Sequence, residues 1–116
     1  MTLKYKIGEV WIADLNPRQG TEAGKRRPVL IIQHQALLDV NHPSTIVLPL
    51  TTKLTEDAIP LRIRLKTEGV LKESDIMIDQ IRSIDNKRLV KGPLFSCSKK
   101  LLNEIKEAVL EVLGFA

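Results

Sequence analysis

The fold is decided by residues 28–50, PVLIIQHQALLDVNHPSTIVLPL. Two short runs stand at the ends of this stretch, residues 28–33 and 45–50, and both are rich in β-branched residues and nearly all apolar. Such runs are typical of strands that are buried on both faces. Between them, residues 34–40 fit a short turn of helix, and residues 41–43 carry the Asn and Pro of a turn. The stretch therefore predicts two core strands with a helical turn between them.

Strand patterns continue on both sides of this stretch. Residues 7–15, IGEVWIADL, alternate roughly between apolar and polar side chains. Residues 75–84, DIMIDQIRSI, alternate again, with a bend expected near Gln80. In residues 59–66, IPLRIRLK, the alternation is clean and predicts a half-exposed strand with one basic face. Its two faces carry Leu61, Ile63 and Leu65 on one side and Arg62, Arg64 and Lys66 on the other.

The character of the sequence changes at Ser98. From there on, apolar residues follow helical spacing, namely Leu101, Ile105, Ala108, Val109 and Val112. Ser98 is a suitable N-cap and Gly114 a suitable end for this helix. The chain thus contains five or so short strands followed by one helix, without room for crossover helices. We expect a mainly β (α+β) fold, in which an antiparallel, strongly curved sheet forms a small barrel with the helix packed on it.

Length and composition bound the class of protein. The 116 residues (13.1 kDa) predict a single domain spanning residues 1–116, and a hydrophobic fraction of 43% supports a globular core. Cys97 is the sole cysteine, which excludes an internal disulfide. There is no secretion signal or apolar run of bilayer length, so we expect a cytoplasmic protein without a membrane partner. The net charge of +4 favours a polyanionic partner, while 3% aromatic residues leave little for base stacking.

The densest positive charge lies between a glycine-framed loop and the first core strand, in residues 20–27, GTEAGKRR. The two glycines permit backbone conformations that let a ligand approach closely. Arg26 and Arg27 carry guanidinium groups that match phosphate oxygens in a bidentate manner. Pro28 pushes Arg27 toward an extended conformation at the start of the strand. From these residues alone, the cluster is either a solvated loop end or a site for an anion, and it lacks the GxxxxGK[ST] pattern of a nucleotide-binding loop.

Two further stretches place polar side chains where a site could form. In PLTTK, residues 49–53, the hydroxyl of Thr51 either donates to a phosphate oxygen at the end of a strand or satisfies a turn. Asp79 and Gln80 interrupt an otherwise apolar strand, which is costly unless they are partnered or functional. The two histidines and the cysteine lack the spacing of metal ligands, and no serine or cysteine triad signature is present.

Three blocks of this sequence, followed by the amphipathic C-terminal helix, resemble the MazF/PemK/Kid toxins of bacterial toxin–antitoxin pairs. The blocks are GEVWIADLNPRQGTEAGKRRPVLII (residues 8–32), TIVLPLTTK (45–53) and DIMIDQIRSIDNKRL (75–89). The most specific element is G-[ST]-E-x-G-x-x-RP, which begins at Gly20 and ends in Arg27 and Pro28. The resemblance implies an SH3-like barrel of about five to seven antiparallel strands with a C-terminal α-helix. It also implies a homodimer and a sequence-specific endoribonuclease that cuts single-stranded RNA without a metal or other cofactor.

The resemblance assigns roles to particular residues. The catalytic positions of the family fall on Arg27, Thr51 and Asp79. The residues implied in substrate binding are Thr21, Glu22, Lys25, Arg26, Thr52, Lys53 and Gln80. Some members carry an arginine two residues before the aspartate, where this chain has Met77, so a mechanism built on that arginine is not expected here. Residues 16–26 correspond to the segment that closes over RNA or is displaced by the antitoxin, and residues 18–26 and 53–60 are the expected specificity loops.

RNA can be cleaved without a metal when its 2′-hydroxyl attacks the adjacent phosphorus, which gives a 2′,3′-cyclic phosphate and a 5′-hydroxyl end. Arg27 and Thr51 are suited to stabilise the developing charge, and either Asp79 acts as the base or in-line positioning supplies much of the rate. The second expected partner is an antitoxin whose acidic, disordered C-terminal segment lies across Arg26 and Arg27 and folds on binding. Two alternatives remain open from the sequence: a non-catalytic CcdB-like toxin that binds DNA gyrase, and an inactive module that only engages the antitoxin.

Overall fold

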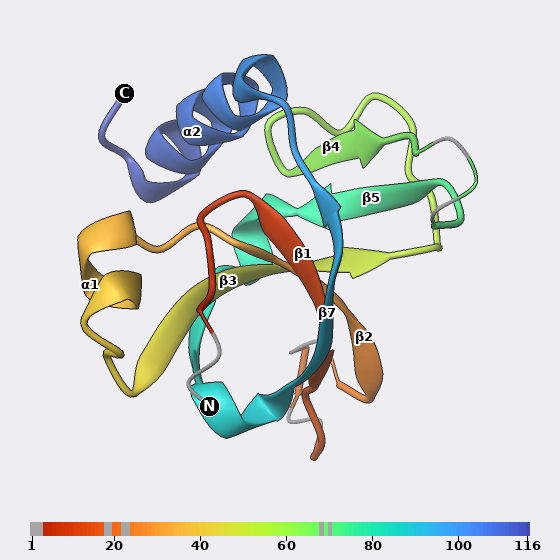
Figure 1. Cartoon of the computed structure of the whole chain (residues 1–116). Helices are drawn as coiled ribbons and strands as arrows, with labels where there is room; N and C mark the ends of the chain where they lie inside the picture. Colours follow the sequence, from red (N-terminus) through yellow and green to blue (C-terminus); the bar gives the residue numbers. More distant parts are fainter. Residues whose placement is uncertain (1–3, 18–19, 22–23, 68, 70) are drawn as a thin grey trace.

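The computed structural model describes residues 4–17, 20–21, 24–67, 69 and 71–116 (Figure 1). Within them the chain forms seven strands, two α-helices and two 3₁₀ turns. In chain order these are β1 (Glu9–Asp14), β2 (Arg26–Ile31), α1 (Gln35–Asp39), β3 (Ser44–Thr51), β4 (Arg62–Leu65), β5 (Ser74–Met77), η1 (Ile78–Gln80), β6 (Arg82–Asp85), η2 (Asn86–Arg88), β7 (Leu89–Ser96) and α2 (Lys99–Leu113). Neither of these α-helices has the length and apolar character needed to cross a membrane.

The seven strands form one antiparallel sheet in the order β4-β5-β3-β2-β1-β7, and β6 pairs with β3. One edge of β3 bonds to β2, and the other edge is divided between β6, at residues 44–47, and β5, at residues 50 and 51. The turn η1 carries the chain from β5 to β6, which is the bend predicted near Gln80. The mainly β fold with a C-terminal helix is confirmed, and in the described part of the chain the sheet follows an open path from β4 to β7.

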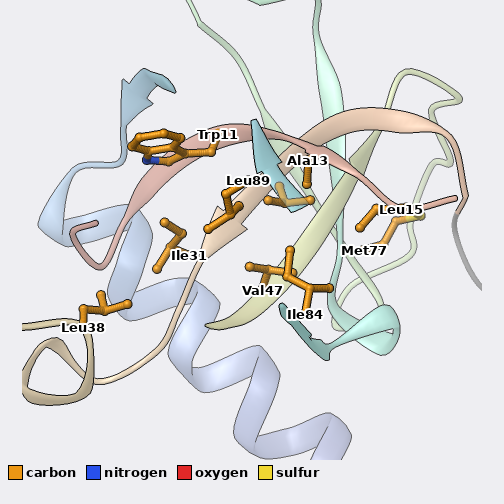
Figure 2. Packing of buried hydrophobic residues seen from close by; sticks show 10 residues of the cluster. Trp11, Ala13, Leu15, Ile31, Leu38, Val47, Met77, Ile84 and Leu89 are labelled. Atoms are coloured by element: carbon orange, nitrogen blue, oxygen red, sulfur yellow. The ribbon is translucent and has the colours of Figure 1, made fainter. Parts of the chain in front are cut away.

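The two faces of the sheet pack into different layers, which explains why the core strands are apolar on both sides. Along β2, Val29 and Ile31 belong to a cluster enclosed by the curved sheet, whereas Leu30 belongs to a second cluster beneath α2. β3 divides in the same way, with Val47 in the inner cluster and Leu48 in the outer one. Figure 2 shows the inner cluster, to which β1, β2, β3, β5, β6, β7 and α1 all contribute.

The C-terminal helix forms as the sequence predicts. Ser98 caps its N-terminus by accepting a hydrogen bond from the backbone N–H of Leu101 (3.1 Å), and Gly114 ends it with a left-handed φ of 83°. Ile105 and Ala108 are buried in the outer cluster. The helix therefore covers the outer face of the sheet, where it contacts η1 (Figure 1).

The predicted helical turn between β2 and β3 is α1, and it gives His34 a structural role. The Nδ1 atom of His34 accepts a hydrogen bond from the backbone N–H of Ala36 (3.0 Å), so this imidazole caps the turn. Leu38 carries the buried face of α1 into the inner cluster.

β7 is a strand that the sequence pattern does not predict, because Gly92 and the proline after it indicate a turn. It pairs with β1 in a register that is irregular beside Trp11. There Gly92 lies against the indole, and a Cβ added to Gly92 would lie 2.5 to 2.9 Å from three of the indole carbons. Trp11 is 3% exposed, and its Nε1 donates a hydrogen bond to Glu9 Oε1 (3.1 Å). The pairing of β7 with β1 therefore relies on the absence of a side chain at position 92.

β4 differs from the sequence expectation in two respects. It begins at Arg62, so Leu61 lies outside the strand and is 47% exposed rather than facing inward. Most of its predicted basic face is neutralised, because Arg62 and Arg64 pair closely with carboxylates, whereas Lys66 contacts one only loosely at 3.8 Å. These pairs join Arg62 to Asp79, Arg64 to Glu56, Glu73 and Asp75, and Lys66 to Glu73. A polyanion thus finds little free positive charge on this face.

Candidate functional site

Arg27 lies at the start of β2, in the extended conformation that Pro28 predicts, and pairs with Ala13 across β1. Its guanidinium is oriented from two sides. Nε donates a hydrogen bond to the carbonyl oxygen of Gly24 (2.9 Å), and Nη1 donates to the carbonyl oxygen of Leu50 at the end of β3 (3.4 Å). These two contacts fix the plane of the guanidinium at the junction of the loop, β2 and β3.

A cavity of about 200 Å³ opens beside this guanidinium. The residues that line it are Lys25, Arg26, Arg27, Pro28, Leu50, Thr51, Thr52 and Ser74. The structure thus brings Arg27 and Thr51 into one site, although they are separated by the whole β2–β3 hairpin. Of the residues predicted to bind substrate, Lys25, Arg26 and Thr52 join them there.

Thr51 is the last residue of β3, and its hydroxyl has a defined local contact. Its Oγ1 accepts a hydrogen bond from the backbone N–H of Lys53 (3.2 Å). Because a hydroxyl oxygen accepts through lone pairs and retains its own hydrogen, this contact leaves the O–H of Thr51 to donate. Both sequence interpretations of Thr51 are therefore compatible: the side chain stabilises a turn and also lines the cavity.

The charges on the cavity wall are of one sign. Among the described residues lining it, Lys25, Arg26 and Arg27 are cationic and none carries a carboxylate. Arg26 is contacted only loosely by Asp14, with 4.0 Å between Nε and Oδ2 on a largely exposed pair, and such exposed pairs are weak. Lys25 has a φ of 55°, and its backbone N–H donates to Asn16 Oδ1 (2.7 Å), which fixes the turn into β2. The site is suited to hold a phosphate group.

The structure places Asp79 elsewhere. It lies in η1, where its carboxylate pairs with Arg62 of β4, and it is not one of the described residues that line the cavity. Gln80 is half-buried in the same turn. Met77, which stands where some relatives carry an arginine, is buried in the inner cluster. The expected convergence of Asp79 on Arg27 and Thr51 is therefore absent from the cavity formed by the described chain.

The remaining predicted residues lie at the margin of the site or outside the described chain. Thr21 and Lys53 are exposed. Glu22 lies outside the described residues, as does part of the predicted loop at 18–26. Ser74 is a cavity residue that the sequence analysis missed: it is buried at the start of β5, and its Oγ donates to the carbonyl oxygen of Lys72 (2.8 Å). Its only sequence signal is that it precedes a strand, which does not distinguish it from other serines.

The described residues contain no group of three or more His, Cys, Asp or Glu side chains placed to hold a metal ion. Cys97 is half-buried, and burial raises the pKa of its thiol to about 11. It is therefore protonated at neutral pH, which is the state of a packing residue rather than a nucleophile.

The described residues thus form a small antiparallel β protein with a cation-lined cavity whose chemistry suits a phosphate group. The sequence profile of the family described as "PemK-like, MazF-like toxin of type II toxin-antitoxin system" matches residues 6–113. The chain belongs to this family, which confirms the resemblance found in the sequence.

Individual relatives agree with this assignment. Endoribonuclease MazF of Staphylococcus saprophyticus is 38% identical over 109 residues, which cover 92% of this chain and 89% of the relative. MazF (Form-I) from Deinococcus radiodurans matches with a TM-score of 0.82 and 21% identity, over 97% of this chain and 99% of that one. MazE-MazF (Form-III) from the same organism matches with a TM-score of 0.79 and 20% identity, over 98% and 100%. At these identities the two solved structures support the fold alone.

Proposed function

We propose that this protein is the endoribonuclease toxin of a type II toxin–antitoxin pair, acting in the cytoplasm, and that it cleaves single-stranded RNA at the cavity between Arg27 and Thr51. The observation that carries the proposal is the shared cavity itself, which combines a fixed guanidinium, a hydroxyl free to donate and two further cations. The relative from Staphylococcus saprophyticus, which carries the name endoribonuclease, supports the same activity.

In the proposed reaction the 2′-oxygen of the nucleotide attacks its own 3′-phosphorus. The new O2′–P bond forms, the P–O5′ bond breaks, and the products are a 2′,3′-cyclic phosphate and a 5′-hydroxyl end. Extra negative charge develops on the non-bridging oxygens before the P–O5′ bond breaks. Arg27 and Thr51 donate to these oxygens, and one such preorganised donor contributes roughly a hundredfold to a thousandfold in rate.

The proton from the 2′-hydroxyl and the proton for the leaving oxygen are not assigned to Asp79. Its carboxylate is paired with Arg62 outside the cavity, and a guanidinium such as that of Arg27 keeps its proton in proteins, so it does not act as a base. The proposal therefore gives the described residues two tasks, holding the phosphate in line and stabilising its charge. Asp79→Asn tests this division, since it should slow cleavage far less than Arg27→Ala does.

The RNA-contacting surface extends from the cavity along the predicted binding residues. Those within the described chain are Thr21, Lys25, Arg26, Thr52, Lys53 and Gln80. An acidic antitoxin segment that covers Arg26 and Arg27 would occupy the same positive wall as the RNA, so binding of the two should be mutually exclusive. A homodimer is part of the proposal, as are metal- and cofactor-independence.

The test is cleavage of end-labelled RNA by the purified protein, read as 2′,3′-cyclic phosphate and 5′-hydroxyl products. Arg27→Ala and Thr51→Ala should each lower the cleavage rate by about a hundredfold or more while the protein stays folded. Lys99→Ala is the matched control, because it removes an exposed cation at the start of α2 and should leave the rate unchanged.

Two further arms address the chemistry. A substrate with a 2′-deoxy sugar at the cleaved position should not be cut, because it lacks the nucleophile, and EDTA should not slow the reaction. Full activity of Arg27→Ala, or cleavage of the deoxy substrate, would refute the proposed mechanism. Wild-type protein that cuts none of a broad set of single-stranded RNAs would refute the activity itself.

A further inference from the structure

We propose that the ion pair between the buried Asp75 and the partly exposed Arg64 positions the Thr51 side of the catalytic cavity, an inference that rests on the proposed function. Asp75 is 1% exposed and lies in the middle of three adjacent strands. In the register of the sheet it stands opposite Thr51 on β3 and opposite Arg64 on β4. Neither Asp75 nor Arg64 lines the cavity around Arg27, so both are positioning residues rather than catalytic ones.

Both oxygens of the Asp75 carboxylate are used. Oδ1 accepts a hydrogen bond from Arg64 Nε (2.6 Å), and Oδ2 accepts one from the backbone N–H of Thr55 (2.7 Å). Arg64 in turn contacts the carbonyl side of Thr55, because its Nη2 donates to the carbonyl oxygen of Thr55 (3.4 Å). The same Nη2 also donates to Glu56 Oε1 (3.2 Å). The pair therefore holds the backbone of Thr55 through both its donor and its acceptor.

The loop fixed in this way is next to Thr51 and the cavity. Thr51 is fixed by its pairing with Asp75, and Thr55 is fixed by Asp75 and Arg64, so the segment between them is held at both ends. Thr51 and Thr52 of this segment line the cavity, and so does Ser74, the residue before Asp75. Asp75 is thus linked to the cavity by its backbone, across the sheet to Thr51 and along β5 to Ser74, and by its carboxylate through the loop after β3.

The chemistry of the pair favours a positioning role over a purely stabilising one. Burial acts to raise the pKa of Asp75, but hydrogen bonds from Arg64 and Thr55 outweigh it and hold that pKa below its ordinary value. The carboxylate is therefore charged at neutral pH. For stability alone, a well-packed apolar pair usually serves a buried site as well as an ion pair does. What an apolar pair lacks is the ability to bond the N–H and carbonyl of Thr55.

The first experiment measures kcat and KM for steady-state cleavage of labelled RNA by Asp75→Asn and Arg64→Lys. Asp75→Asn removes the charge at nearly constant size, and Arg64→Lys keeps a cation but loses the forked geometry. Each should lower kcat by about tenfold to a hundredfold with little change in KM, because displacement of a catalytic group by about an ångström has effects of this size. Lys66→Gln is the matched control, since it removes an exposed ion pair with Glu73 from the same strand region and should leave kcat unchanged.

A double-mutant cycle separates positioning from a general loss of structure. If Asp75 acts through Thr51, then Asp75→Asn should slow the Thr51→Ala enzyme by less than about threefold, because the positioned hydroxyl is already gone. Multiplicative effects of the two substitutions would overturn the inference, as would unchanged kcat in both Asp75→Asn and Arg64→Lys.

Hydrogen exchange supplies a readout that does not depend on activity. The amide of Thr55 should exchange at least about tenfold faster in Asp75→Asn than in wild type or Lys66→Gln, because its acceptor carboxylate is replaced by a weaker one. An unchanged exchange rate at Thr55 would refute the fixing of the Thr55 backbone by Asp75, whether or not the protein cuts RNA. A third outcome is possible: the wild-type protein cuts no RNA, yet Thr55 exchanges faster in Asp75→Asn. This outcome would refute the proposed function and the link to catalysis, and would support only the fixing of the Thr55 backbone by Asp75.

Discussion

Replacement of Gly92 by alanine should destabilise the fold through a single steric contact. The new Cβ would lie 2.5 Å from Cδ2, 2.7 Å from Cγ and 2.9 Å from Cε3 of the Trp11 indole. Gly92 does not have a positive φ, so alanine suits its backbone and the cost comes from the contact alone. The indole is rigid and buried between β1, β7 and the Tyr5 ring, whose centroid lies 4.9 Å away. Neither the new Cβ nor the indole of Trp11 can relieve this contact by a simple rotamer change.

The magnitude follows from two terms. Overpacking of a well-filled core costs about 1–3 kcal/mol. Displacement of the indole also weakens the hydrogen bond from Trp11 Nε1 to Glu9 Oε1, which contributes about 1 kcal/mol. The sum is about 2–4 kcal/mol of unfolding free energy. With an unfolding entropy of about 2.1 cal/mol/K per residue over 116 residues, the midpoint temperature should fall by about 8–16 °C.

The assay is thermal and urea unfolding followed by circular dichroism and by the fluorescence of Trp11, the sole tryptophan. Gly92→Ala should lower both midpoints and shift the emission of the native state. In a Trp11→Phe background, where the ring is smaller, the same substitution should cost at least about 1 kcal/mol less. An unchanged midpoint, or equal costs in the two backgrounds, would refute the steric account.

Three further predictions concern other parts of the chain. The pKa of Asp75 is lower in the folded state than its ordinary value of 3.8. The charged carboxylate therefore stabilises the fold above about pH 4, and this stabilisation is lost as the pH falls through the folded pKa. The free energies of urea unfolding of wild type and Asp75→Asn should differ at pH 5–7 and converge in acid. With a thiol pKa of about 11, Cys97 should react with iodoacetamide at pH 8 at least about a hundredfold more slowly in native protein than in urea, and equal rates would contradict its burial. Ser98→Ala removes the cap of α2 and should cost about 1 kcal/mol in urea unfolding, with Ser98→Asp restoring most of it.

The elements that follow from local patterns were predictable from the sequence. The core strands β2 and β3 are continuous apolar runs, and α2 has a complete set of signals in its cap, its spacing and its terminal glycine. β7 was not predictable, because a Gly-Pro pair interrupts it and its strand character arises from pairing with β1, a segment about eighty residues earlier. Such pairing is a property of the sheet and leaves no periodic trace in the strand itself.

The site was predictable only where its residues belong to strands that the sequence pattern identifies. Arg27 lies near the start of β2 and Thr51 at the end of β3, and because these neighbouring strands are antiparallel their meeting follows from topology once both strands are assigned. The position of Asp79 was not predictable from alternation, since the chain leaves the strand at η1 and the carboxylate turns to Arg62. The basic face of β4 was misjudged because its carboxylate partners come from the loop before it, from Glu73 and Asp75 at and before the start of β5, and from η1.

The pairing of β1 with β7 also constrains how the protein is made. The inner cluster takes residues from β1 near the start of the chain and Leu89 near its end, so a ribosome must release most of the polypeptide before that cluster can close. The strands around the cavity, β2, β3 and β5, emerge earlier, yet they rest on a cluster that is incomplete until β7 follows. Because non-local pairings of this kind are slow to form, we expect the inner cluster, and with it the support of the cavity, to be completed only after β7 has been synthesised.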